Sequence, residues 1–171
     1  MSTKSLVALG VVVVASVGLL AFASRWAGSP VTPGPALTAR TSSSSDLAAN
    51  QYSYNFGTIS MKDGVVHRDF TITNTSSSTV TLAGVDTSCM CTTAYVVHAD
   101  GSKEGPFGMD GMGYRYDASD TLAPGATTTV RVVYDPAAHG PAGVGHIDRT
   151  IDLHEANGST LQLEIAADVT P

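Results

Sequence analysis

Apolar and polar side chains alternate with a period of two along most of the chain after residue 50. In residues 161–168, Leu, Leu, Ile and Ala alternate with Gln, Glu, Ala and Asp, and similar runs cover residues 66–73, 80–85, 127–134 and 147–153. Clusters of Asn, Asp, Gly and Pro separate these runs, and Gly84 predicts a bulge or a kink in one of them. This period is typical of half-buried strands. We therefore expect an all-β domain over residues 51–171, folded as one antiparallel β-sandwich.

Six segments of this domain follow the order of a known family pattern. They are residues 54–59, 70–75, 85–92, 122–125, 130–135 and 161–165. Together they resemble the bacterial Ig-like domains related to the Hydin and major-sperm-protein modules, in a secreted or membrane-anchored branch of unknown function that carries an S-C-G-C-T element. The resemblance implies an immunoglobulin-like sandwich and no particular activity. The chain departs from the pattern at Met90, which replaces the glycine between two cysteines, and in residues 93–121, which are longer than the usual connection.

The amino-terminal residues predict a location outside the cytoplasm. Lys4 precedes an uncharged, apolar stretch at residues 6–23, and a helix of that length spans about 27 Å, close to the ~30 Å hydrocarbon core of a bilayer. Ala21-Phe22-Ala23 also fits a signal-peptide cleavage pattern. Residues 1–28 are therefore expected to be a signal anchor or a signal peptide. The first alternative gives a single-pass membrane protein with its domain in the periplasm or at the cell surface, and the second gives a secreted protein.

Residues 29–50 are rich in Pro and Ser and predict a flexible linker between this helix and the domain. Residues 51–171 hold 14 acidic and 6 basic residues, a formal charge of −8, without a basic cluster. This balance argues against nucleic-acid binding. The sequence also lacks a G-x-S-x-G elbow, a phosphate-binding loop and an H-E-x-x-H motif, so we expect no enzyme activity.

The only cysteines of the chain are Cys89 and Cys91, in Ser88-Cys89-Met90-Cys91-Thr92. On an extended strand two such side chains lie about 6.6 Å apart on one face, whereas a disulfide requires Cβ atoms about 3.8 Å apart. A disulfide therefore forms only if the chain turns at Met90, and the small ring that results is expected to be easily reduced. A metal ion bridges the wider gap more readily.

Soft thiolate and thioether ligands select Cu(I). Met109 and Met112 lie in the long 93–121 segment, and if it folds over the cysteines, all four residues surround one ion, with His98 as a further ligand. Alternatively, the methionines cover apolar surface of the sandwich. Zinc and calcium are less favoured, because no ligand pairs have the usual spacing. The remaining histidines near turns and strand ends are interpreted as surface residues: His139, His146 and His154.

These observations favour a membrane-tethered interaction domain of the cell envelope, which binds a partner protein through a sheet edge or loops and needs no cofactor. The alternative is a site at the cysteines. It is either a Cu(I) site formed by Cys89, Cys91, Met109 and Met112, or a redox pair in which Cys89 and Cys91 exchange electrons with other envelope thiols. A structural role of the two cysteines stays open beside both.

Overall fold

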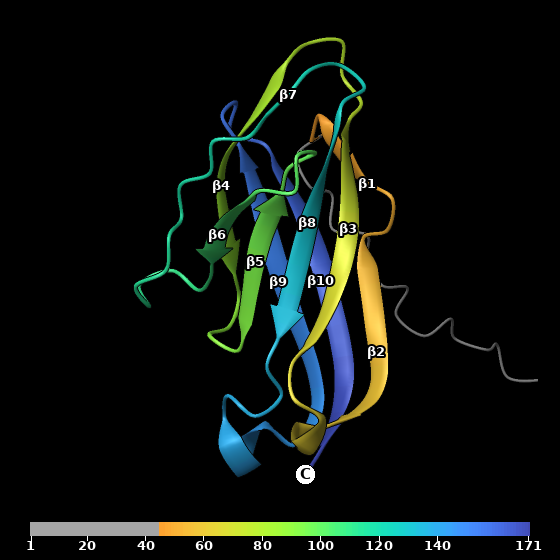
Figure 1. Ribbon diagram of the computed structural model, residues 1–171, viewed down its shortest axis with the longest axis vertical. Helices are drawn as coiled ribbons and strands as arrows, with labels where there is room; N and C mark the ends of the chain where they lie inside the picture. Colours follow the sequence, from red (N-terminus) through yellow and green to blue (C-terminus); the bar gives the residue numbers. More distant parts are fainter. Residues whose placement is uncertain (1–44) are drawn as a thin grey trace, which may run out of the picture. The chain divides into compact units, whose positions relative to one another are not determined.

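The structure, a computed structural model, describes residues 45–171. They form two five-stranded sheets that pack face to face (Figure 1). One sheet has the order β1-β3-β8-β5-β6 and the other has the order β2-β10-β9-β4-β7. The strands are β1 Leu47–Ala49, β2 Ser53–Ser60, β3 Val66–Asn74, β4 Val80–Thr87, β5 Thr92–Val97, β6 Lys103–Phe107, β7 Thr121–Leu122, β8 Thr127–Tyr134, β9 Gly145–Glu155 and β10 Thr160–Thr170. Two short 3-10 helices, η1 Met61–Asp63 and η2 Gly140–Gly143, lie in connections.

The alternation in the sequence corresponds to alternation in burial. Along β8 every second side chain is buried, and β10 shows the same pattern over most of its length. The core lies between the sheets, and its largest fully buried side chains include Tyr134, Phe70, Phe107, Ile72, Leu82 and Ile151. Burial of one such apolar side chain contributes roughly 1.5–3 kcal/mol. The prediction of an all-β sandwich over this region is confirmed.

The predicted bulge in β4 is also confirmed, since its pairing with β9 shifts register between Leu82 and Gly84. One part of the topology differs from the prediction of an antiparallel sandwich. Strand β2 pairs with β10 in parallel, from Ser53 opposite Glu164 to Ser60 opposite Thr170. A period of two shows which face of a strand is buried, but it does not show the direction of the strand beside it.

The first sheet begins earlier than residue 51, where the sequence predicted the domain to start. Strand β1 falls within the predicted 29–50 linker, with Leu47 buried and paired to Asn74 of β3. A three-residue strand is too short for its alternation to be recognised in the sequence. The predictions of an amino-terminal helix at residues 1–28 and of a linker up to residue 44 lie outside the described residues. Within residues 45–171 no helix has the length and apolarity needed to cross a membrane.

Two connections between the sheets come together at one end of the sandwich (Figure 1). Residues 88–91 lead from β4 in one sheet to β5 in the other, and residues 135–144 lead from β8 to β9. The two connections are joined by a hydrogen bond from the Asp135 amide to the Cys91 carbonyl, at 2.9 Å. This bond fixes the segment that carries both cysteines against a segment that is distant in sequence.

Candidate functional site: a disulfide at the end of the sandwich

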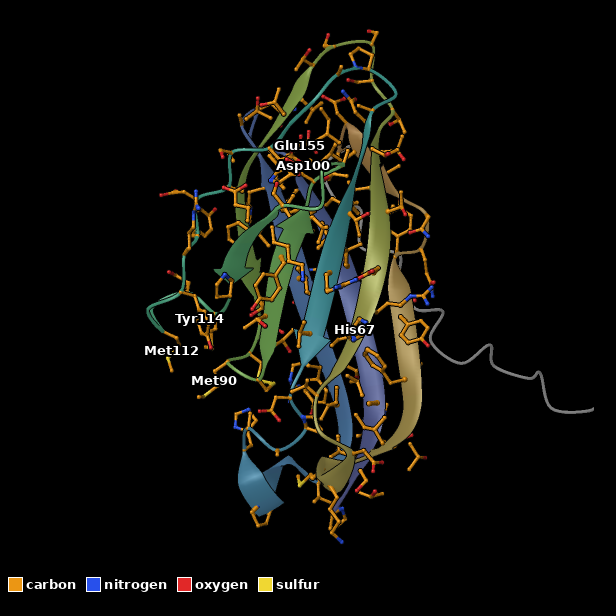
Figure 2. The ribbon with its side chains drawn as sticks, viewed as in Figure 1. His67, Met90, Asp100, Met112, Tyr114 and Glu155 are labelled. Carbon is orange, nitrogen blue, oxygen red and sulfur yellow. A yellow bond between two sulfur atoms is a disulfide. The ribbon has the colours of Figure 1, made fainter. Side chains whose placement is uncertain are left out.

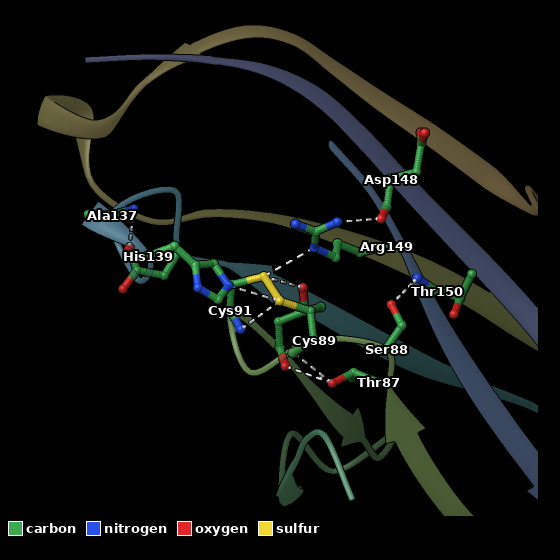
Figure 3. The surroundings of a disulfide bond; sticks show 11 residues. Thr87, Ser88, Cys89, Cys91, Ala137, His139, Asp148, Arg149 and Thr150 are labelled. Atoms are coloured by element: carbon green, nitrogen blue, oxygen red, sulfur yellow. Dashed lines mark hydrogen bonds between the residues drawn. A yellow bond between two sulfur atoms is a disulfide. The ribbon is translucent and has the colours of Figure 1, made fainter. Parts of the chain in front are cut away.

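Cys89 and Cys91 are joined by a disulfide in the turn between β4 and β5 (Figure 3). The Thr92 amide donates a hydrogen bond to the Cys89 carbonyl at 3.0 Å, which closes a four-residue turn around Met90. The Thr87 hydroxyl lies 3.1 Å from the Cys89 carbonyl and 3.0 Å from the Thr92 carbonyl, so it ties both ends of the turn together. The sequence suggested that the cysteines lie on an extended strand, and the structure shows that they do not. The chain turns at Met90, which is the condition under which the pair can close.

The two cysteines differ in exposure. Cys91 belongs to the core and is 3% exposed, whereas Cys89 is half-buried. Met90 between them is 44% exposed, and Figure 2 shows its side chain at the surface. The Cys91 amide donates to the Cys89 sulfur at 3.3 Å, which fixes the orientation of the Cys89 side chain. A reagent in solution therefore reaches the disulfide from the Cys89 side.

His139 contacts the more exposed sulfur. Its Nε2 atom lies 3.2 Å from Cys89 Sγ (Figure 3). The position of His139 follows from the turn after β8, in which the Asp135 carboxylate accepts a hydrogen bond from the Ala137 amide at 2.9 Å. His139 then immediately precedes η2, where Gly140 and Pro141 begin the 3-10 helix. The sequence predicted turns at these residues and a surface position for His139, and the structure confirms both, since His139 is exposed. The contact of His139 with Cys89 was not predicted.

Arg149 contacts the buried sulfur from strand β9. Its Nε atom donates to Cys91 Sγ at 3.3 Å, and a second guanidinium nitrogen donates to the Asp148 carbonyl at 2.7 Å. The neighbouring Thr150 amide donates to the Ser88 hydroxyl, and the Ser88 amide donates to the Thr150 carbonyl. This pair of bonds holds the cysteine turn in register with β9. The guanidinium places a fixed positive charge beside the sulfur that solvent does not reach.

The structure brings together Cys89, Cys91 and His139, whose possible ligand atoms all lie within 4.8 Å of one another. The other candidates are placed elsewhere. His98 pairs with the Asp120 carboxylate at 3.4 Å. Met109 and Met112, in the loop between β6 and β7, are 38% and 49% exposed, and Figure 2 shows Met112 at the surface. The participation of these methionines in a metal site stays a prediction.

A second polar cluster lies beside the loop of residues 108–120. His154 Nε2 is 2.9 Å from the Asp86 carboxylate, and its Nδ1 is 3.1 Å from the Thr160 hydroxyl. The Tyr116 ring lies against His154, with centroids 5.5 Å apart, and a hollow of about 370 Å³ is lined by Asp86, Asp110 and Tyr116. Burial raises the pKa of Tyr116, and nearby carboxylates, Asp86 first, raise it further. Both ring nitrogens of His154 are hydrogen-bonded, which ties β9 to β4 and β10, and the loop contacts this histidine through the Tyr116 ring.

Part of the chain is similar to a family without an assigned function. Residues 47–104 match the family model described as "Protein of unknown function (DUF1573)". This segment is about a third of the chain and includes the cysteine turn. The more specific relation to Hydin and major-sperm-protein modules is not confirmed by it. No curated protein matches the sequence.

Several solved structures are similar in fold. A protein of unknown function from Porphyromonas gingivalis W83 gives a TM-score of 0.48 at 16% identity, over 71% of this chain and 46% of that one. The Vibrio cholerae VesB protease gives 0.47 at 19% identity, over 72% and 32% of the two chains. PapD-like domain 7 of human CEP192 gives 0.43 at 14% identity, over 74% and 87%. This chain thus spans less than half of the first two proteins, and such similarities describe the fold alone.

Proposed function

We propose that this domain is an extracytoplasmic protein-interaction module that exchanges its Cys89–Cys91 disulfide with the thiols of a partner protein. The observation that supports this function is the unequal environment of the two sulfur atoms. Cys89 is half-buried, whereas Cys91 is buried and its Sγ receives the N–H of Arg149. Exchange requires one sulfur that can be attacked and another that can leave as a thiolate.

The reaction begins when a thiolate of a partner dithiol attacks Cys89 Sγ. A bond forms between the partner sulfur and Cys89, and the Cys89–Cys91 bond breaks with its electron pair on Cys91. The thiolate that forms on Cys91 is stabilised by the adjacent guanidinium of Arg149. The second thiol of the partner then displaces Cys89 from the mixed disulfide. The partner ends as a disulfide and this chain ends reduced, with a thiol at Cys89 and a thiolate at Cys91 beside Arg149. One proton of the partner dithiol is then on Cys89, and the other has passed to the solvent.

The proposed location is the cell envelope, with the domain outside the cytoplasm. The apolar stretch at residues 6–23 favours export, and disulfides persist in compartments that are oxidising. In this proposal the predicted linker at residues 29–50 serves as a spacer between the membrane and the domain. Met90 is exposed between the cysteines, so a partner that docks on this turn contacts its side chain.

Glutathione is a suitable probe for the asymmetry of the pair. When the oxidised full chain is incubated with glutathione and quenched with acid, mass spectrometry of its peptides shows which cysteine carries the adduct. We expect the adduct on Cys89. The two single variants, each of which keeps one thiol, provide the matched control. With a small aromatic disulfide as the probe, the Cys91→Ser variant, which retains Cys89, should react more than about tenfold faster than the Cys89→Ser variant.

Two results would contradict the proposal. One is a disulfide that stays intact in glutathione, which would show that the pair is a structural crosslink. The other is an equal distribution of adduct between the cysteines in the folded wild-type chain. Urea unfolding of both variants establishes that they are folded, and peptide mapping of the wild-type chain requires no variant.

A further inference from the structure

We propose that the reduced form of this site binds one Cu(I) ion through Cys89 Sγ, Cys91 Sγ and His139 Nε2. This proposal rests on the exchange function in one respect, because the disulfide must be reduced before both sulfurs can act as ligands. It starts from three donor atoms that come from two separate connections and lie within 4.8 Å of one another. His139 Nε2 is already 3.2 Å from Cys89 Sγ.

The type of the donors suits Cu(I). Thiolate sulfur is a soft ligand that selects Cu(I), and imidazole is a suitable ligand for copper. Zn²⁺ takes four protein ligands in structural sites and three with a water in catalytic sites, so the charge of the site, and not the number of donors, distinguishes the two ions. Among the His, Cys, Asp and Glu side chains of the described residues, this cluster contains three possible ligands. A three-coordinate soft ion fits this set without a further ligand.

The charges of the two thiolates and of Arg149 favour Cu(I) over Zn²⁺. Two thiolates and one Cu(I) carry a net charge of −1, and Cys91 is buried, so an unbalanced charge there would be costly. The Arg149 guanidinium, 3.3 Å from Cys91 Sγ, supplies the compensating positive charge without occupying a ligand position. With Zn²⁺ the two thiolates are already neutralised, and Arg149 would leave a net charge of +1. The site is therefore electrically balanced for a monovalent cation.

This ligand set differs from the one expected from the sequence. His139 replaces Met109 and Met112 as the further donor, because the β8–β9 connection brings it to the cysteine turn. The oxidation state of the cysteines then controls binding, since in the disulfide neither sulfur is a thiolate. Reduction by a partner dithiol supplies two electrons to the S–S bond. Cu(I) enters afterwards and displaces the remaining thiol proton from Cys89, and its own oxidation state does not change.

The test is a titration of the chemically reduced full chain with Cu(I) under anaerobic conditions, in competition with the chelator bicinchoninate. We expect one Cu(I) per reduced chain and none for the oxidised chain. His139→Ala should weaken binding by more than about tenfold, whereas the Met109→Ala/Met112→Ala variant should bind like the wild type. X-ray absorption of the wild-type complex should show two sulfur neighbours and one nitrogen neighbour around copper.

An affinity no higher than that of the Cys89→Ser/Cys91→Ser variant would overturn the proposal, and so would a copper environment without nitrogen. The absorption measurement uses the wild-type chain, so it decides the question even where a variant fails to fold. Glutathione exchange is measured without metal. A chain that exchanges but binds no Cu(I) overturns the metal proposal alone, and a chain that binds Cu(I) but resists glutathione overturns the exchange proposal alone.

Discussion

Replacement of Arg149 by glutamine should make the Cys89–Cys91 disulfide harder to reduce. The guanidinium donates to Cys91 Sγ at 3.3 Å, and that sulfur becomes negatively charged when the disulfide opens. Two unit charges about 4 Å apart interact by roughly 4 kcal/mol at an effective dielectric constant of 20. Arg149 is partly exposed, so solvent screening lowers this value. A hydrogen bond to a charged group contributes about 1.5–3 kcal/mol net, and we take about 2 kcal/mol.

For a two-electron couple this energy corresponds to a reduction potential about 40 mV more negative in Arg149→Gln than in the wild type. The assay equilibrates each oxidised chain with glutathione buffers at pH 8, alkylates the free thiols after acid quenching, and counts them by mass spectrometry. Arg131→Gln is the matched control, because its guanidinium binds Asp69 on β3 instead of a sulfur. A potential within about 10 mV of the wild type, or a less negative one, would refute the role of Arg149.

Three further predictions concern stability. Ile151→Ala removes a fully buried side chain from β9 and should lower the free energy of unfolding by about 2–5 kcal/mol in urea. Asp69 is held by two hydrogen bonds from Arg131, the first cause of its lowered pKa, so this carboxylate stabilises the fold above its unfolded-state pKa. The stabilisation should be lost as pH falls through the folded-state pKa. The Asp69→Asn variant should be less stable by about 0.2–1 kcal/mol at neutral pH, and its unfolding free energy should no longer show this loss at acid pH. The pKa of His146 is raised, chiefly by its hydrogen bond to Asp168. Its contribution to the free energy of unfolding is therefore present below the unfolded-state pKa and should fade as pH rises through the folded-state pKa. A His146→Gln variant whose stability depends on pH as in the wild type would contradict this assignment.

The strands could be predicted from the sequence because their burial alternates with a period of two. Strand β8 and the bulge at Gly84 both follow from local patterns, and the structure confirms them. The parallel pairing of β2 with β10 could not be predicted, since it depends on the order of strands within a sheet. Direction and order are set by packing between elements that are distant in sequence.

The candidate site could be predicted only in part. The spacing of Cys89 and Cys91 drew attention to the pair, and it showed that a disulfide requires a turn at Met90. The sequence placed them on a strand, because it contains no local signal for the turn that Thr87 ties together. His139 and Arg149 lie 50 and 58 residues from the cysteines that they contact, so no spacing motif links them.

The reduction potential of Cys89–Cys91 in the full-length wild-type chain decides whether this pair is a site of exchange or a structural crosslink. Disulfides that take part in exchange have potentials of about −120 to −270 mV, whereas structural disulfides of secreted proteins have potentials below about −300 mV. Equilibration with glutathione buffers should give a single two-electron transition within the first range. A disulfide that stays oxidised throughout these buffers, with a potential below about −300 mV, would contradict the proposed function.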